Sequence, residues 1–464
     1  MKNNIRRNCC TGLLSFVSLS SFAQGVRTAY FLDSFHYRHQ LNPALSGDQN
    51  YFSLPGIGSL NIGFNGNVGL SDFLYPVKDI KGKEILTTFM SRYVDSSDFL
   101  DGLAEKTRIR NSVDLTVFST GFKSWGGFST IDIGLHSRTS INLPYELFEF
   151  MKVGDYGIER NVYNLRDIGA STNNYMDISL GHSHQINDRL QVGASIKALF
   201  GLGRIDITFD EMNVQMSEDQ WLIDANGEIN SSFKGLEYTT NKQLEVDGFN
   251  FIPDKIGLSG VGVAVDLGAT YEVIDNLLFS ASIIDLGFIN WNTTNSAKTN
   301  NQPYLFRGFD QIGVGADSPF PSIEEQFETL GDDLEDLIKV YDRGEKERST
   351  MLGATVNVGL EYVLPVYNKF SIGLLSTTYL NKPFTWTEGR LSANISPVRW
   401  FEASVSGVYS NFGSGMGFLL NLHPKGFSLF MGADFSFGEV TPQFMPVDHS
   451  NVSLVTGINF PLNL

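Results

Sequence analysis

The chain has 464 residues, 42% of them hydrophobic, and its 34 basic and 51 acidic side chains give a formal net charge of -17. This acidic balance argues against nucleic acid as a partner, because phosphate binding requires clustered Lys and Arg. The only two cysteines are Cys9 and Cys10, so the rest of the chain has no disulfide, thiolate nucleophile or cysteine-ligated metal. No apolar run after Ala23 reaches the roughly 18 residues that a helical membrane span needs. Any contact with a membrane core would therefore be made by strands.

The N-terminus has the features of a secretory signal peptide over residues 1–23. Lys2, Arg6 and Arg7 give it a basic start, and Thr11 to Leu19 form an apolar stretch that is too short to span a bilayer. We expect export and cleavage near residue 24. Loss of these three basic residues would leave 31 basic and 51 acidic side chains, a formal charge of -20.

The stretch "YRHQLNPALSG", Tyr37 to Gly47, crowds histidine, arginine and proline into a few positions. Pro43 fixes its own φ and biases Asn42 toward extended geometry, while the Asn42 side chain can bond nearby backbone groups. The tripeptide Asn42-Pro43-Ala44 is therefore predicted to form a rigid turn. A metal site at His36 and His39 is the alternative, but no further Asp, Glu or His nearby completes a ligand set.

Strict alternation of apolar and polar residues recurs along the remaining chain. In "VGVAVDLGATYE", Val261, Val263, Val265 and Leu267 share one face and Asp266 lies on the other. Short turns precede several segments of this pattern, which is typical of tight hairpins. The pattern predicts fourteen strands, at 58–68, 112–122, 127–138, 174–186, 189–200, 260–273, 277–290, 350–364, 369–380, 384–395, 399–410, 415–422, 427–437 and 451–460.

The connections between these strands fall into two classes. Short turns of two to four residues alternate with longer connections, which include 69–111, 139–173, 201–259 and 291–349. Short turns on one rim and long loops on the other are the layout of an outer-membrane β-barrel, with the apolar faces toward lipid. Trp125 and Trp400 lie beside short turns, and Trp291 and Trp386 lie at the opposite strand ends, so we expect two interfacial girdles.

Two of the long loops, 201–259 and 291–349, carry most of the acidic excess and are expected to face the outside. Apolar residues at helical spacing between Ile323 and Tyr341 predict an amphipathic helix in the second loop. It would pack on the mouth of the barrel. A partner-binding or gating helix is the alternative.

The final strand carries Val452, Leu454, Ile458 and Phe460 on one predicted outward face. Together with Gly457, this pattern partly resembles the terminal signal that the barrel insertion machinery reads, which makes that machinery an expected partner. The pattern departs from such signals in that "PLNL" follows Phe460.

The stretch "YRHQLNPALSG" followed by "SLNIGFNGNVGLSDFLYPVKD" resembles the N-terminus of an uncharacterised family of Bacteroidota outer-membrane proteins. Asn42-Pro43-Ala44 is also similar to a sequence near the start of the long-chain fatty acid transporter barrels, and Leu41 to Ala44 to one in membrane components of the type nine secretion apparatus. The resemblance implies an all-β fold: a fourteen-stranded transmembrane antiparallel barrel, residues 58–464, whose lumen holds residues 24–57 as a hatch. We call residues 24–57 the hatch segment.

Strand parity places many carboxylates on the polar, lumenal face, and a narrow lumen requires cations or donors beside them. The hatch segment supplies Arg27 and Arg38. We predict that Arg38 pairs with lumenal carboxylates, Asp266 and Asp434 among the candidates, once Asn42-Pro43-Ala44 sets the turn that delivers it. The carboxylates on this face are Asp132, Asp177, Asp266, Glu272, Glu361, Glu402 and Asp434.

The sequence contains no convincing nucleophile and base pair, which disfavours a secreted soluble enzyme, and no cofactor or metal site is predicted. The first functional hypothesis is a passive barrel in the Gram-negative outer membrane that admits small molecules, hydrophobic ones by resemblance to the fatty acid transporters. Its expected partners are outer-membrane lipid and such a ligand. The alternative is a non-transporting scaffold whose partner is a secretion-system or surface protein. Fold analogy alone does not decide between them.

Overall fold

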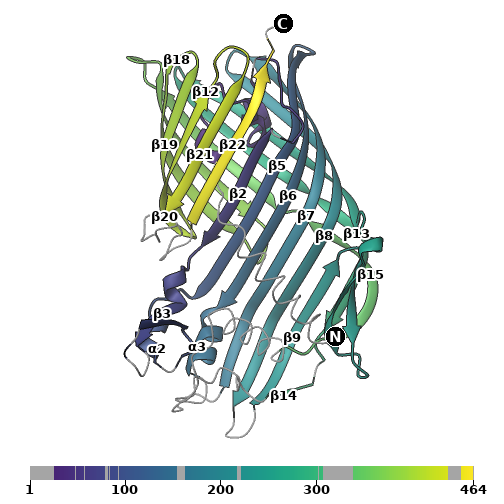
Figure 1. The fold of residues 1–464 in the computed structure, drawn as a ribbon. Helices are drawn as coiled ribbons and strands as arrows, with labels where there is room; N and C mark the ends of the chain where they lie inside the picture. The colour runs from purple at the N-terminus through teal and green to yellow at the C-terminus, as the bar shows by residue number, and fades with distance from the viewer. Residues whose placement is uncertain are drawn as a thin grey trace.

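The structure is a computed structural model of the full chain (Figure 1). It describes residues 26–47, 49–56, 58–78, 82, 84–91, 93–153, 162–216, 221–300, 302–306, 338–436 and 451–462. The expected signal peptide at residues 1–23 lies outside this described part.

Fourteen antiparallel strands form a closed barrel. The first barrel strand, β2, pairs with β5 on one side and with the last strand, β22, on the other, which closes the ring. Each predicted strand corresponds to one observed strand, so the predicted fold class is confirmed. In ring order the strands are β2 (Ser59–Gly66), β5 (Lys106–Ser124), β6 (Gly127–Pro144), β7 (Val162–Asn187), β8 (Leu190–Met216), β12 (Gly260–Ile274), β13 (Leu277–Lys298), β16 (Ala354–Val363), β17 (Phe370–Leu380), β18 (Trp386–Val398), β19 (Phe401–Ser410), β20 (Gly413–Leu422), β21 (Ser428–Ser436) and β22 (Asn451–Pro461).

The two rims of the barrel differ as the loop lengths predict. Tight turns join β5 to β6, β7 to β8 and β12 to β13 at the rim where the C-terminus lies (Figure 1). Strands β7 and β8 are 26 and 27 residues long, however, and with their neighbours they extend well beyond the ends of β19 to β22 (Figure 1). The predicted strands at 174–186 and 189–200 therefore covered only the rim-proximal part of each.

The long-loop end is folded rather than irregular. Phe89, Phe99 and Phe148 form the centre of an apolar core there, which the extended parts of β7 and β8 complete. None of the described helices is long and apolar enough to cross a membrane. The elements at this end are η4 (Leu70–Asp72), β3 (Leu74–Lys78), β4 (Glu84–Thr88), α2 (Ser96–Leu100), α3 (Tyr145–Val153), β9 (Trp221–Ser232), β10 (Leu236–Thr240), β11 (Val246–Phe251), η5 (Pro253–Lys255), β14 (Tyr304–Phe306) and β15 (Tyr341–Met351).

The predicted amphipathic helix falls mostly outside the described residues, because residues 307–337 are not among them. Its last predicted residue, Tyr341, begins strand β15 instead. That strand pairs with β13.

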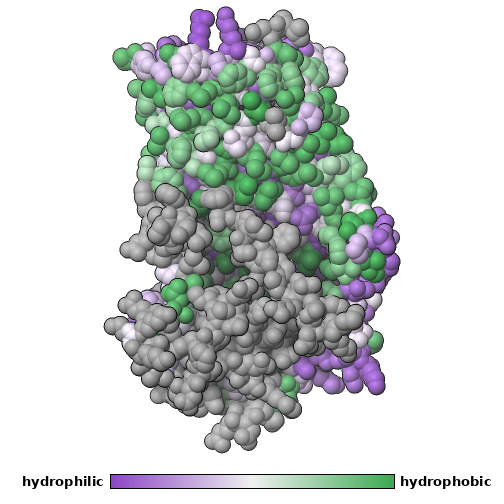
Figure 2. Space-filling view, viewed as in Figure 1, coloured by the Kyte–Doolittle hydropathy of each residue, from purple (hydrophilic) through white to green (hydrophobic). Residues whose placement is uncertain are grey.

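The outer face of the barrel is apolar. Figure 2 shows hydrophobic residues gathered over the strands near the short-turn rim. On β12, Val261, Val263 and Leu267 are 50%, 51% and 49% exposed, whereas Asp266 is 3% exposed. The predicted assignment of this strand's two faces is thus confirmed, and it is inverted relative to a soluble barrel.

The tryptophan prediction is half correct. Trp125 and Trp400, beside the short turns, are 85% and 54% exposed. Trp291 and Trp386 are buried at 1% and 2% exposure, so the second girdle is wrong. Both rings point inward, where Trp291 donates to Thr350 Oγ1 at 2.7 Å and packs in an internal apolar cluster.

Substitution of Leu267 by Arg is expected to destabilise the barrel strongly. Leu267 lies at the middle of β12 on the apolar outer face. An arginine near the bilayer midplane costs about 2 to 4 kcal/mol. Unfolding by urea of the barrel inserted in lipid vesicles measures the loss. Ser112→Arg is the matched control, because Ser112 lines the internal cavity; equal losses at both positions would contradict the lipid-facing assignment.

Candidate functional site

The described part of the hatch segment lies inside the barrel. It folds as three short helices and one strand: η1 (Val26–Ala29), η2 (His36–Gln40), η3 (Pro43–Leu45) and β1 (Tyr51–Phe52). Leu32, Phe35 and Tyr37 are buried against Phe430 and Val455 of the wall. Strand β1 then pairs with both β5 and β22. The segment therefore crosses the lumen and ends in the barrel wall at the short-turn rim.

The turn at Asn42-Pro43-Ala44 has the geometry that the sequence predicts. Asn42 is extended, with φ -157° and ψ 111°, and its side-chain oxygen accepts a hydrogen bond from the Ala44 backbone amide at 3.0 Å. Its Nδ2 donates to the Tyr30 hydroxyl at 3.2 Å, and the whole residue is 0% exposed. Asn42 thus caps η3 and ties it to Tyr30, the residue that follows η1.

Two wall glycines make room for this turn. A Cβ atom on Gly268 of β12 would overlap the Asn42 side chain, and a Cβ on Gly193 of β8 would overlap the backbone of Pro43 and Ala44. The turn therefore lies directly on the backbone of two adjacent wall strands.

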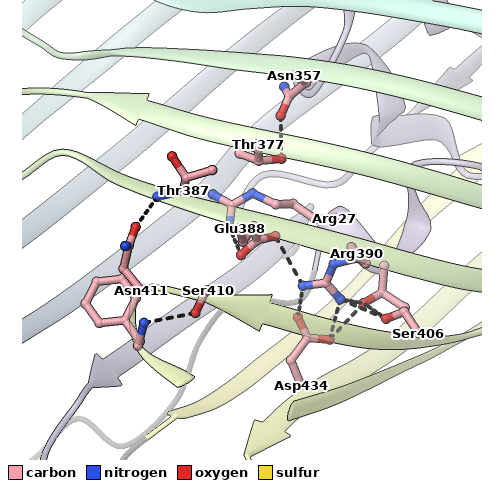
Figure 3. Close-up of polar contacts among 12 residues, drawn as sticks. Arg27, Asn357, Thr377, Thr387, Glu388, Arg390, Ser406, Ser410, Asn411 and Asp434 are labelled. Atoms are coloured by element: carbon pink, nitrogen blue, oxygen red, sulfur yellow. Dashed lines mark hydrogen bonds and ion pairs between the residues drawn. The ribbon is translucent and has the colours of Figure 1, made fainter. Parts of the chain in front are cut away.

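A buried ion network joins the start of the hatch segment to β18 and β21 (Figure 3). Arg390 Nη2 lies 2.7 Å from Asp434 Oδ2 and 3.4 Å from Glu388 Oε1. Arg27 of the hatch segment pairs with the other oxygen of Glu388 at 3.2 Å, and Thr28 donates to Asp434 at 2.7 Å. Hatch and wall thus share two carboxylates. Gly417, where a Cβ would overlap Asp434, leaves space for this approach.

A second charged network follows the opposite wall. Lys197 lies 2.9 Å from Asp266 and 2.6 Å from Asp285. Asp285 also accepts from Arg138 at 3.1 Å. These ion pairs explain how buried carboxylates are tolerated inside the barrel. In the same wall, His136 bridges Asp114 and Asp177 at 2.6 and 2.7 Å.

The predicted pairing of Arg38 with Asp266 or Asp434 requires correction. Arg38 Nη1 instead pairs with Asp33 of its own segment at 3.0 Å. The partner of Asp266 is Lys197, and that of Asp434 is Arg390. The wall strands carry inward-facing cations that pair with these carboxylates, which strand parity did not reveal. Arg38 pairs instead with Asp33, which lies only five residues before it in the chain.

Among the described residues, His39 supplies a second direct ionic link between hatch and wall. His39 Nε2 lies 3.0 Å from Asp132 Oδ2, and its Nδ1 lies 2.9 Å from the His36 carbonyl oxygen. Burial opposes the charged form of His39, but the Asp132 carboxylate outweighs it and raises the pKa of His39. Burial lowers the pKa of His36 to about 4. Among the described residues no group of three His, Cys, Asp or Glu side chains could hold a metal ion.

A cavity of about 180 Å³ lies between the hatch segment and the wall. His39 and Pro43 are among the hatch residues that line it, and charged side chains of six wall strands line part of the rest. These charged wall residues are Arg110, Asp114, Asp132, Arg138, Asp177, Lys197, Asp266 and Asp285. Sequence reasoning missed Arg110, because the predicted strand began at residue 112 whereas β5 begins at Lys106.

Several solved outer-membrane proteins resemble the structure at low identity. The toluene transporter TbuX of Ralstonia pickettii has 9% identity and a TM-score of 0.45 over 96% of this chain and 100% of that chain. The toluene transporter TodX of Pseudomonas putida has 10% identity and a TM-score of 0.41 over 96% and 99%. A FadL homologue of Pseudomonas aeruginosa has 9% identity and a TM-score of 0.34 over 90% and 91%.

No curated protein matches the chain. One family model matches residues 43–434, which begin at the proline of the hatch turn and reach Asp434 of the ion network. This match covers well over half of the 464 residues. The chain therefore belongs to a family of unknown function, DUF5723.

Proposed function

We propose that this protein is a passive channel of the Gram-negative outer membrane, in which small molecules cross the barrel when the hatch segment moves. The supporting observation is the cavity of about 180 Å³ that lies between hatch and wall. A fourteen-stranded barrel is wide enough to hold a lumen. Here residues of the hatch segment pack against the inner face of its wall.

The hatch segment is attached in a way that suits a movable part. Over η1 to η3 its contacts with the wall are side-chain hydrogen bonds, ion pairs and packing, such as Arg27 with Glu388 and His39 with Asp132. Within the described hatch segment, the backbone hydrogen bonds to wall strands lie in β1 and in the residues close to it, such as Ser53 with Ser119 and Gly56 with Val117. Side-chain contacts can break without opening the barrel, so motion of η1 to η3 is compatible with an intact wall.

The lining of the cavity bears on the solute. A purely hydrophobic ligand, as suggested by the sequence resemblance, would meet charged groups such as Asp114, Arg110 and Arg138. Desolvating those groups against an apolar molecule costs free energy. The described cavity therefore favours a solute with a charged or hydrogen-bonding group.

Flux into proteoliposomes tests the channel. The purified barrel should admit small solutes faster than protein-free vesicles do. A variant that lacks residues 26–47 should admit them faster still, because those residues cross the lumen. The heat-modifiable mobility of each protein shows whether it is folded. If vesicles with the folded parent and vesicles with the folded variant were both impermeable, the proposal would be contradicted. Neither the fold nor the comparisons favour the alternative of a secretion scaffold.

A further inference from the structure

Arg110 on β5 is a buried cation that has no carboxylate in ion-pair contact among the described residues. It is 8% exposed and lines the internal cavity. Its guanidinium lies 4.4 Å from the ring centroid of Tyr379 and 4.9 Å from that of Trp386. Its Nη1 has no hydrogen-bond acceptor in the described part of the chain. A buried charged donor without an acceptor is unfavourable, so an anion that entered the cavity would gain free energy by binding it.

The other cations that line the cavity differ in this respect. Arg27 has Glu388 at 3.2 Å, Arg138 has Asp285 at 3.1 Å, and Lys197 has Asp266 at 2.9 Å. Each of these three cations is therefore already paired with a carboxylate of the wall. Among the described Lys and Arg residues that line the cavity, Arg110 is the one whose guanidinium has no carboxylate partner and can bind an added anion.

The surroundings of Arg110 add to its attraction for an anion. The Arg27 guanidinium lies 4.7 Å from the centroid of the same Trp386 ring, so two cations share one indole. Five carboxylates line the same cavity and oppose an anion, but each lies within 3.0 Å of a basic side chain. The pairs are Asp114 and Asp177 with His136, Asp132 with His39, and Asp266 and Asp285 with Lys197. Arginine suits a carboxylate in particular, because its planar donors match the two carboxylate oxygens.

Part of the cavity lining is apolar. Leu41 and Pro43 of the hatch segment contribute to it, as do Leu115, Ile133 and Ile284 of the wall. A ligand that carried both an anionic head and a short apolar part would fit this mixture better than an inorganic ion would.

We propose that the cavity is a binding site for a small organic carboxylate, with the carboxylate on Arg110 and the apolar part among these side chains. This assignment names a solute class for the proposed channel and rests on the proposed function. Because Pro43 and Leu41 belong to the hatch segment, a bound carboxylate would contact the hatch directly.

Calorimetric titration of the purified full-length protein with sodium butyrate tests the site, with uncharged butyramide as the matched ligand. Butyrate should bind and butyramide should bind at least about tenfold more weakly, because the charge-assisted hydrogen bonds are lost. Arg110→Gln should lose butyrate affinity by a similar factor, whereas Arg110→Lys should keep part of it. Asp114→Asn should bind butyrate more tightly. Arg189→Gln, at an exposed arginine on the short-turn rim, should bind it like the parent.

Several results would overturn the inference: no butyrate binding by the folded parent, equal affinity for butyramide, or unchanged affinity in Arg110→Gln. Proteoliposome flux of butyrate separates this inference from the proposed channel. Flux without binding at Arg110 would refute the carboxylate site and leave the channel in place. Binding without flux in any variant would support the site and refute the channel.

Discussion

Removal of residues 451–464 is expected to abolish barrel formation. These residues include β22, which pairs with β21 along one edge and with β2 along the other. Without β22, the facing edges of β21 and β2 would expose unpaired backbone amides and carbonyls to the bilayer core, where each costs several kcal/mol. The heat-modifiable band of the folded barrel should be absent from outer-membrane fractions.

A shorter truncation provides the control. Residues 463–464 lie beyond the end of β22 at Pro461, so their removal should leave the folded band in place. The outward residue Leu454, 41% exposed, belongs to the face that the insertion machinery would read. A normal folded barrel without residues 451–464 would refute both the closure by β22 and its proposed role in insertion.

The number of strands, and the face of the sheet on which each side chain lies, could be predicted because both follow from the local sequence pattern. A period of two fixes which residues share a face, and tight turns fix which strands are adjacent. Strand length was less predictable. Beyond residue 200, β8 continues through Arg204, Asp206 and Asp210, which resemble loop residues in the sequence. Salt bridges and packing with the folded long-loop end stabilise that extension, as Asp206 shows with Arg348 at 2.6 Å.

Parity could also have placed Trp386 correctly. It alternates in phase with Glu388 and Arg390, which are both buried in the lumen. The expectation of a second aromatic girdle overrode that signal. The Trp386 ring instead points inward and makes cation–π contacts with Arg27 and Arg110.

The candidate site was predictable only in part. The turn at Asn42-Pro43-Ala44 depends on local backbone preferences, which a sequence reveals. Ion-pair partners depend on which strands meet across the lumen. Arg27 and Arg390 come together at Glu388, although 361 residues separate Arg27 from that carboxylate along the chain. No pattern within one strand predicts such a contact.

Substitution of Gly268 by Leu is expected to displace the hatch turn. The new side chain would occupy the position of the Asn42 amide and of Pro43 Cδ, and the β12 backbone cannot retreat because it is paired on both sides. Overpacking of this kind costs typically about 1 to 3 kcal/mol. Here the strain is relieved if the hatch segment moves, since its side-chain contacts are weaker than the strand ladder. Single-channel recording in planar bilayers should then show longer open times and more frequent openings than in the parent.

Gly389→Leu is the matched control, because nothing lies within 4 Å of a Cβ at Gly389. Gly389 lies between the inward Glu388 and Arg390, so its own added side chain would face outward. This variant should therefore conduct like the parent. If Gly268→Leu folded normally and gated like Gly389→Leu, the docking of Asn42 and Pro43 on β12 would not be what keeps the lumen closed.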